Sequence, residues 1–473
     1  MVKGIGPREM AAIAAAQGAG QAARLLRRGG GTALPGLVAE RVSPRILRRL
    51  TRQLRRGVII VTGTNGKTTT SRMLGAILDA AGWHAIHNRS GSNLVRGLIA
   101  TLVQESNLGG NLHADSGLFE VDEATVPAVV AQVRPRLLLI NNLFRDQLDR
   151  YGEIDHIHRR WRETLATLDA RSTVVLNADD PAVAVLGRSL AARVCYYGIA
   201  DTGQALAALP HAADAIDCPV CGHRLDYSAI LLSHLGHYRC PACGFVRPAP
   251  DIVAESVALQ GTEATRLTVR AGEQTFPVEL AVPGFYNAYN GLGACAAALT
   301  LGLSADIIRR GLGGFRAAFG RIERVAAGTS GKHLLLALVK NPVGFNEVLR
   351  MLFPPQHEAP PRHLLIIIND LIADGRDVSW LWDVDFEVLG EPGRVASATC
   401  AGIRATDMAN RLKYAGLDPA RIRVVEELDA ALEATLAALP AGETLYVLPT
   451  YTAMLDFRAL LQRRGWVSQF WEQ

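Results

Sequence analysis

The sequence predicts an α/β protein of about three domains, in which a central domain is built on a parallel sheet. Strand-like apolar runs alternate with helix-like runs from Gly57 to about Leu186, which is the pattern of strands joined by helical crossovers. The same alternation resumes from Lys332 and predicts a second, C-terminal α/β domain. Between these stretches, two Cys-x-x-Cys pairs interrupt the pattern and predict an inserted metal-binding element.

The positive charge of the chain is concentrated in residues 1–56, which carry twelve basic and two acidic side chains. Their net charge is +10, so the remainder of the +5 chain carries −5. Residues 8–28 predict an Ala-rich helix, and Pro44 opens a second helix with an apolar face and an arginine face. Such a helix either lies on an anionic membrane surface or packs on a core with its arginines in solvent. An excess this local argues against a protein that coats nucleic acid.

Residues 58–70 predict a phosphate-binding loop. Four β-branched residues form a strand, a Gly-containing turn follows at 63–66, and 71–81 has the periodicity of a helix. The backbone N–H groups at a helix N-terminus favour phosphate. Lys67 would reach the β- and γ-phosphates, and the Thr68 hydroxyl would ligate Mg²⁺. Val61 stands where the general P-loop pattern has its first glycine, so the loop is a shorter form of an ATP-binding loop.

Polar residues follow several predicted strands, where ligands bind in parallel sheets. Glu120, Asp122 and Glu123 form one such group, which either holds a metal ion or is a solvated acidic turn. Asn287 and Asn290 precede an Ala-rich helix, and they either face a ligand or cap that helix.

The four cysteines predict a zinc ribbon. Eighteen residues separate Cys218-Pro-Val-Cys221 from Cys240-Pro-Ala-Cys243, which is the spacing of a four-Cys zinc site. Four thiolates complete the tetrahedral coordination of zinc, so no position remains for a catalytic water. The predicted role of the ion is therefore structural.

Motifs in this order and spacing resemble the Mur ligase superfamily. They are residues 63–68, 120–123, 142–149 and 177–181, the pair Asn287 and Asn290, and Gly320-Arg321. Within that superfamily, the four-Cys insertion and residues 369–383 resemble the MurT family, the synthetase subunits of lipid II isoglutaminyl synthase. The resemblance implies a basic helical segment at 1–56, a Mur ligase-like central P-loop ATPase domain at 57–325 with the ribbon inserted at 214–248, and a C-terminal Rossmann-like α/β domain at 326–473.

The resemblance also assigns roles to individual residues. It implies Lys67, Glu120 and Asp383 as catalytic groups, and Thr68 with Glu120 as ligands of magnesium. The implied nucleotide-binding residues are Gly63, Thr64, Asn65, Gly66, Lys67, Thr68, Thr69, Asn287, Asn290 and Arg321. Residues 340–342 stand where Mur ligases carry a His-Asn-Pro segment that closes over ATP, with Lys340 in place of the histidine.

The implied activity is ATP-dependent amidation of the D-glutamate α-carboxyl in the lipid II stem peptide, through an acyl phosphate, to give D-isoglutamine for cell-wall peptidoglycan. No cysteine lies in a predicted nucleophile turn, so the nitrogen would arrive from a partner or from solution. The resemblance implies ammonia from a glutaminase partner, which in this family is GatD. An aspartate of 374–385 is expected to reach across to the partner. Two tryptophans that precede Asp383 favour it, with Asp377 and Asp374 next.

Two other functions share these features. A Mur-type or folylpolyglutamate-type ligase would use the same ATP loop to add an amino acid. A nucleic-acid-binding ATPase would account for the zinc ribbon and the basic N-terminus, but aromatic and basic residues do not interleave in the ribbon. No apolar run reaches the roughly 18–20 residues of a membrane span and no signal peptide is evident, so we expect a cytoplasmic protein, with contact to the inner face of the membrane left open.

Overall fold

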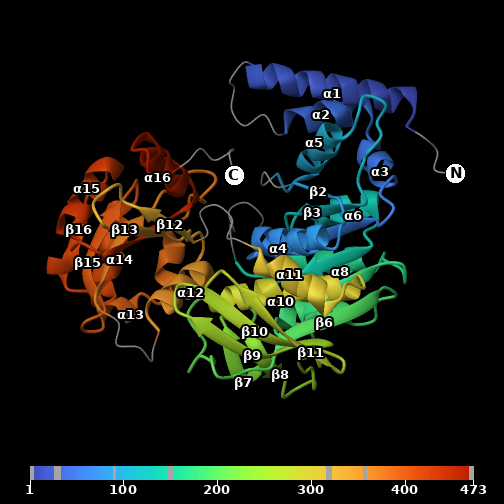
Figure 1. Cartoon of the computed structure of the whole chain (residues 1–473). Helices are drawn as coiled ribbons and strands as arrows, with labels where there is room; N and C mark the ends of the chain where they lie inside the picture. Colours follow the sequence, from blue (N-terminus) through green and yellow to red (C-terminus); the bar gives the residue numbers. More distant parts are fainter. Residues whose placement is uncertain are drawn as a thin grey trace.

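The computed structural model describes residues 5–25, 33–88, 92–145, 154–315, 322–354 and 360–467. These residues form two large sheets with helices on both faces, and one separate hairpin. Figure 1 shows the C-terminal sheet, in orange and red, beside the central domain, and the N-terminal helices at the far side of the latter. Among the described helices, none is both long and apolar enough to cross a bilayer.

Three helices form the N-terminal segment: α1 (Pro7–Leu25), α2 (Leu34–Val42) and α3 (Ile46–Thr51). The apolar face of α3 is buried in the central domain through Ile46, Leu47 and Leu50, whereas Arg48 and Arg52 are exposed. The sequence left open whether this helix lies on a membrane surface or packs on a core. In the structure its apolar face packs on the core.

The central sheet has nine strands in the order β11-β10-β9-β6-β5-β4-β1-β3-β2. Its strands are β1 (Val58–Thr62), β2 (Ala85–His87), β3 (Ser116–Glu120), β4 (Leu137–Ile140), β5 (Thr173–Asn177), β6 (Arg193–Ile199), β9 (Ile252–Gln260), β10 (Ala264–Ala271) and β11 (Gln274–Leu280). The pairs from β2 to β9 are parallel, and β9, β10 and β11 form an antiparallel extension. The predicted parallel sheet is confirmed.

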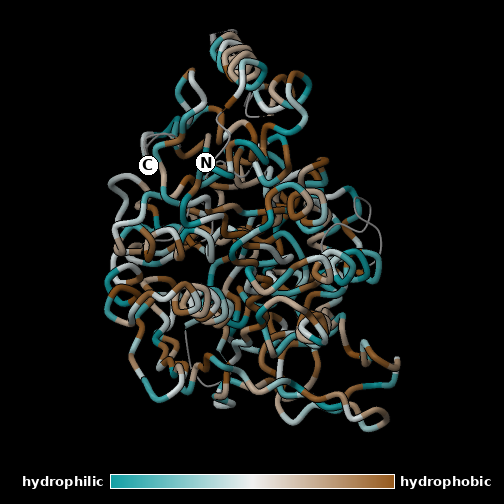
Figure 2. The backbone as a smooth tube through the Cα atoms, turned by 90° about the vertical axis from the view of Figure 1, so that its right-hand side faces the viewer, coloured by the Kyte–Doolittle hydropathy of each residue, from teal (hydrophilic) through white to brown (hydrophobic). Residues whose placement is uncertain are grey.

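Alternate residues of these strands supply two cores. Ile59 and Val61 face a core with α4 (Lys67–Ala80), α10 (Phe285–Thr300) and α11 (Ala305–Gly313). Val58 and Ile60 face the opposite core, with α5 (Val95–Glu105), α6 (Val126–Val133) and α8 (Ile154–Leu165). Both faces are thus covered, which explains why the parallel strands are almost continuously apolar. In Figure 2, brown apolar stretches of the chain run through the middle of the molecule.

The order of the strands sets the position of the functional loops. Strand β1 lies between β4 and β3, with Val61 opposite Glu120 and Thr62 opposite Ile140. The loop after β1 is therefore flanked by the residues that end or follow its two neighbours. Between β5 and β6 lie the short helices α9 (Pro181–Ala184) and η1 (Val185–Gly187).

The insertion lies between β6 and β9 and contains a two-stranded hairpin of β7 (Asp226–Leu232) and β8 (Leu235–Arg239). Its four cysteines lie at the open end of this hairpin, before β7 and after β8. The turn of the hairpin, at 233–234, lies at the opposite end.

The C-terminal sheet has six strands in the order β12-β13-β17-β14-β15-β16. They are β12 (Glu323–Ala326), β13 (His333–Leu336), β14 (Arg362–Ile367), β15 (Val395–Ala401), β16 (Ile422–Val424) and β17 (Thr444–Pro449). The helices are α12 (Pro342–Leu352), η2 (Ser379–Asp383), α13 (Glu387–Gly390), α14 (Ala405–Tyr414), η3 (Pro419–Arg421), α15 (Leu428–Ala438) and α16 (Tyr451–Arg463). The predicted second α/β domain is confirmed. Because β12 pairs with β13, the domain boundary that we expected after residue 325 falls inside a strand of this sheet.

Candidate functional site

The loop after β1 has the backbone geometry of a tight glycine turn. Gly63 and Gly66 have φ angles of 129° and 82°, which favour glycine. A Cβ atom on Gly66 would lie 1.9 Å from Oδ1 of Asn290, and one on Gly63 would lie 2.9 Å from the backbone nitrogen of Asn142. Both conformation and space therefore require glycine at these two positions. The turn leads into the N-terminus of α4, where the helix dipole favours an anion.

Lys67 is the first residue of α4 and only 8% of it is exposed. Its ammonium group donates to the carbonyls of Gly63 and Thr64, at 2.7 and 3.1 Å, and pairs with Oε2 of Glu123 at 3.0 Å. Glu123 follows β3, and its carbonyl accepts a hydrogen bond from the indole of Trp161. The lysine is thus fixed beside the loop by its own turn and by one carboxylate.

Thr68 and Glu120, the two predicted magnesium ligands, are in direct contact. The Thr68 hydroxyl donates to Oε1 of Glu120 at 2.9 Å, and Glu120 is 5% exposed at the end of β3. Asn88 holds the Glu120 backbone on both sides, through bonds to its N–H and its carbonyl. A hydroxyl next to a carboxylate is a donor set of hard oxygens, which fits Mg²⁺.

Asn287 and Asn290 lie in the first turns of α10 and are each 4% exposed. Asn290 donates to Asn287 at 3.0 Å and accepts from Thr70 at 3.3 Å, while Asn287 donates to the carbonyl of Pro283 at 2.7 Å. Asn290 therefore packs against the P-loop, with its Oδ1 close to Gly66. A direct contact of either amide with nucleotide stays a prediction.

The remaining predicted nucleotide-binding residues divide into three sets. Thr64 and Asn65 lie in the turn, and Thr69 is buried in the first turn of α4. Arg321 lies outside the described residues. So do Asp146 and Asp149, which belong to the 142–149 motif and not to the predicted nucleotide-binding residues.

Two asparagines at this site were part of sequence motifs but were not predicted as site residues. Asn142 clasps the turn, because its Oδ1 accepts from the N–H of Asn65 at 2.8 Å and its Nδ2 donates to the Asn65 carbonyl at 3.1 Å. Asn341 caps α12 of the C-terminal domain and donates from Nδ2 to Oδ1 of Asn65 at 2.9 Å. The Asn341-Pro342 helix start could have indicated the cap, but not its contact with a loop 276 residues away.

The four cysteines form a compact cluster in which all Sγ atoms lie within 4.8 Å of one another. Cys218 is 3.6 Å from Cys243, and Cys221 is 3.5 Å from Cys240. Tetrahedral zinc with Zn–S bonds of about 2.3 Å needs sulfur atoms about 3.8 Å apart, so the cluster fits that ion. Hydrogen bonds from backbone N–H groups, led by that of Cys243, lower the pKa of the Cys240 thiol to about 6.

The aspartates of 374–385 have separate environments. Asp374 is buried against Thr452, Asp377 is exposed and accepts from the N–H of Ser379, and Asp383 pairs with Arg145 of the central domain at 3.2 Å. Asp385 accepts from Asn346 and lies 2.7 Å from His211 of the central domain. The two aspartates at the end of the segment therefore lie at the contact between the domains. Trp382, between Leu381 and Asp383, is 53% exposed.

Two family models match the chain: the Mur ligase middle domain over residues 61–217 and the MurT ligase C-terminal domain over residues 338–454. The chain is 32% identical to the lipid II isoglutaminyl synthase (glutamine-hydrolyzing) subunit MurT of Streptococcus pneumoniae, over 93% of this chain and 94% of that protein. It is 31% identical to the corresponding subunit of Staphylococcus aureus strain COL, over 92% and 93% of the two chains.

Solved structures resemble the fold at lower identity. A pseudomurein peptide ligase type C from Methanothermus fervidus superposes with a TM-score of 0.67 and 22% identity, over 88% of this chain and 80% of that one. Folylpolyglutamate synthase of Mycobacterium tuberculosis, complexed with ADP and AMPPCP, gives a TM-score of 0.57 and 14% identity, over 97% and 96%. At these identities the likeness concerns the fold alone.

Proposed function

The chain belongs to the MurT family, and from this premise we propose that it catalyses the ATP-dependent amidation of lipid II. The carboxylate acceptor is the α-carboxyl of D-glutamate in the stem peptide, and the product is D-isoglutamine. The contact of Thr68 with Glu120, beside Lys67 at the start of α4, carries the proposed use of ATP. The similarity to the lipid II isoglutaminyl synthase subunits supports the proposed substrate.

The chemistry needs such a site because a carboxylate is a poor acceptor for ammonia. Transfer of the γ-phosphoryl group of ATP to the carboxylate forms an acyl phosphate, from which ammonia then displaces phosphate. A Mg²⁺ ion held by Thr68 and Glu120 would supply charge neutralisation during the transfer. Lys67 would contribute a second positive charge from the start of α4, and the backbone N–H groups of the first turn of that helix would orient the phosphates.

The nitrogen donor is proposed to be a separate glutaminase. A Cys nucleophile acts as a thiolate, yet burial raises the pKa of Cys195 to about 11 and those of Cys295 and Cys400 to about 12. The other four cysteines form the zinc-type cluster. Because none of the seven suits amide hydrolysis, ammonia would come from a partner of the GatD type, in a heterodimer.

Asp383 is proposed to assist that partner. A Cys-His glutaminase works best when a carboxylate orients its histidine. Asp383 is about one-third exposed beside the exposed Trp382, so it can present one carboxylate oxygen while Arg145 holds the other.

We place the protein in the cytoplasm, with lipid II reached at the inner face of the plasma membrane. The exposed Arg48 of α3 and Arg52, which follows that helix, support a peripheral contact with anionic lipid.

The test is ADP release by the purified chain supplied with ATP, Mg²⁺ and lipid II. We expect continued release to require both lipid II and ammonium. The acyl phosphate forms on lipid II, and ammonia must displace its phosphate before the next turnover. Release that depends on a free amino acid in place of ammonium would favour a Mur-type or folylpolyglutamate-type ligase. Release stimulated by nucleic acid and indifferent to lipid II would overturn the proposal.

A further inference from the structure

The turn of the zinc-ribbon hairpin is packed into the central domain, far along the hairpin from the cysteines. Its two residues are Ser233, whose φ is 52°, and His234. Ser233 donates to the carbonyl of Ala212, and the hydroxyl of Tyr227 donates to the carbonyl of His234 at 2.8 Å. His234 is completely buried. The turn thus has one fixed position, in which the insertion presents a histidine to the interior.

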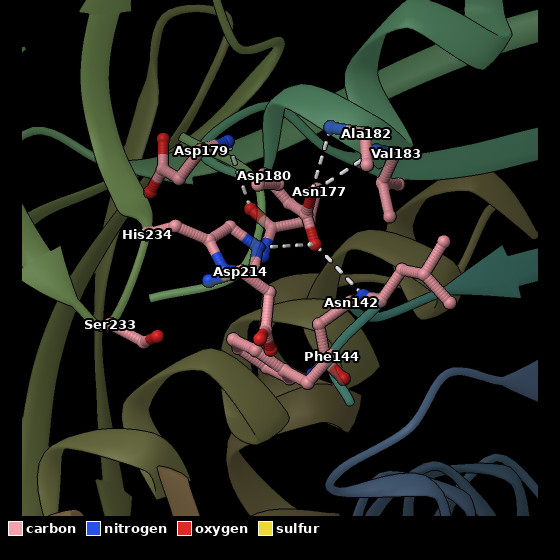
Figure 3. A network of polar contacts seen from close by, with 12 residues as sticks. Asn142, Phe144, Asn177, Asp179, Asp180, Ala182, Val183, Asp214, Ser233 and His234 are labelled. Atoms are coloured by element: carbon pink, nitrogen blue, oxygen red, sulfur yellow. Dashed lines mark hydrogen bonds and ion pairs between the residues drawn. The ribbon is translucent and has the colours of Figure 1, made fainter. Parts of the chain in front are cut away.

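His234 lies between the end of β5 and the segment after β4, as Figure 3 shows. Its Nε2 is 3.6 Å from Oδ2 of Asp180, and its Nδ1 accepts from the N–H of Asp214 at 3.4 Å. The ring packs on that of Phe144 with a centroid distance of 4.7 Å. Nε2 is fully buried and makes no hydrogen bond to any group of the described chain. The side chain is therefore positioned mainly by the bond to its Nδ1 and by packing on Phe144.

The same groups hold residues 143–145. The N–H of Leu143 donates to Oδ2 of Asp180 at 2.8 Å, and the N–H of Arg145 donates to Oδ2 of Asp214 at 2.9 Å. Phe144, between them, is 3% exposed and contacts His234 through its ring. Both ends and the centre of this segment are therefore fixed by the insertion or by the turn after β5.

Residues 142 and 144 in turn hold the P-loop. The Thr64 hydroxyl accepts from the N–H of Phe144 at 3.0 Å and donates to its carbonyl at 3.1 Å. The N–H of Thr64 donates to the carbonyl of Asn142 at 3.2 Å. A displacement of Phe144 would therefore move Thr64 and the adjacent N–H groups of the loop.

We propose that His234 is a positioning residue for the nucleotide, through Phe144 and Thr64. The inserted ribbon would then contribute to nucleotide binding without touching the nucleotide. The inference rests on the proposed use of ATP, since it concerns the loop that would bind it. Misplacement of a group that orients a reacting ligand is costly even when the group lies outside the contact shell.

The test is the affinity of the purified chain for ATP and Mg²⁺, measured by calorimetry. We expect His234→Ala to weaken ATP binding about tenfold. The matched control is His237→Ala, in β8 of the same hairpin, whose ring bonds to the Ile199 carbonyl at 2.8 Å. We expect the control to bind ATP like the wild type, because His237 bonds to Ile199 and His234 is the histidine that packs on Phe144. A general weakening of the hairpin would instead lower the ATP affinity of both variants.

A second variant keeps the insertion intact. Phe144→Leu removes the ring that touches His234 but leaves the backbone bonds to Thr64, and it should weaken ATP binding severalfold. The double variant should bind no worse than His234→Ala, because the two residues act in series. In steady state, the KM for ATP should rise while kcat at saturating ATP changes little.

Three results would overturn the inference. The first is ATP affinity of His234→Ala within twofold of wild type, and the second is an equal loss in His237→Ala. The third is an unchanged affinity in Phe144→Leu, which decides the matter if the histidine variants do not fold. A wild-type chain that binds no ATP would instead overturn the proposed function, and this inference with it.

Discussion

The P-loop and the 374–385 segment of the C-terminal domain are both dense in candidate functional side chains, but they are organised differently. At the P-loop, Lys67 and Thr68 begin one helix, and each contacts a carboxylate at or just after the end of β3, Glu123 and Glu120 respectively. In the 374–385 segment, the aspartates contact separate partners: buried Asp374 bonds to Thr452, whereas Asp383 and Asp385 contact Arg145 and His211 of the other domain.

The difference has a physical origin. The P-loop residues are placed by the parallel order β4-β1-β3, which brings three strand ends together whatever the surrounding loops do. The aspartates lie on a short helix and its flanking loops, so each carboxylate accepts hydrogen bonds from a different neighbouring group. A site at strand ends can therefore be located from its motif, whereas a site on loops needs the partner surface.

The largest effect should follow from Lys67→Ala, which tests the P-loop side of the comparison. We expect lipid II-dependent ADP release to fall by about 10²–10³-fold, because the lysine charge acts on the transferring phosphoryl group. Lys332→Ala is the control, since its ammonium bonds to the Leu436 carbonyl in the C-terminal domain. Turnover at the wild-type rate in Lys67→Ala would remove this loop from the chemistry.

Cys218→Ser should lower the free energy of unfolding by about 3 kcal/mol or more, because it would remove one ligand of the predicted zinc ion, whose binding is linked to folding. The surviving folded fraction should retain most of its turnover, since Cys218 lies at the end of the hairpin opposite His234. The measurements are one zinc per wild-type chain by elemental analysis and a denaturant titration of both proteins. A wild-type chain without zinc or iron would contradict the prediction.

Asp383→Asn tests the other side of the comparison. In the complex with the glutaminase, we expect glutamine-driven amidation to fall about tenfold or more, with ammonium-driven amidation nearly unchanged. Asp377→Asn is the matched control, exposed on the same segment. Equal loss with both nitrogen sources would assign Asp383 to the synthetase site or to the domain contact through Arg145. Loss only in Asp377→Asn would transfer the role to that residue.

The smallest effect concerns pH. A hydrogen bond to Asp385 raises the pKa of His211 above its usual value of 6.5. The pair therefore stabilises the domain contact fully below that value, and its contribution is lost as pH rises through the raised pKa. His211 is largely exposed, so we expect less than about 1 kcal/mol between pH 6 and 8. Denaturant unfolding of wild type and His211→Gln across this range should converge at high pH, and parallel curves would contradict the prediction.

Sequence reasoning located the elements whose pattern is local. It predicted the alternation of strands and helices from Gly57 to about Leu186 and the four cysteines that the structure brings together. It missed α2, whose Leu34–Val42 is short, and it ended the central domain inside β12. Hydrophobic periodicity could not have prevented either error. Helix α2 is short, and β12 is defined by its pairing with β13 rather than by the pattern of its own residues.

The candidate site was predictable in part for the same reason. Residues 63–68 and Glu120 follow from motif and strand order. The contacts of Asn341 with Asn65 and of His234 with Phe144 join residues far apart in the chain, and each depends on how an inserted or C-terminal element docks. His234 lies in the turn of an inserted hairpin, and no pattern in the sequence predicts that this turn is buried.

The most direct test of the account is mass spectrometry of lipid II after incubation with this chain, ATP, Mg²⁺ and ammonium. The account predicts a product lighter by the difference between a hydroxyl and an amino group, with the change assigned by fragmentation to the α-carboxyl of D-glutamate. Lys67→Ala should leave lipid II unaltered under the same conditions. The account would be contradicted if lipid II kept its mass after incubation with folded, ATP-binding wild type. It would also be contradicted if lipid II gained the mass of an amino acid when one was supplied.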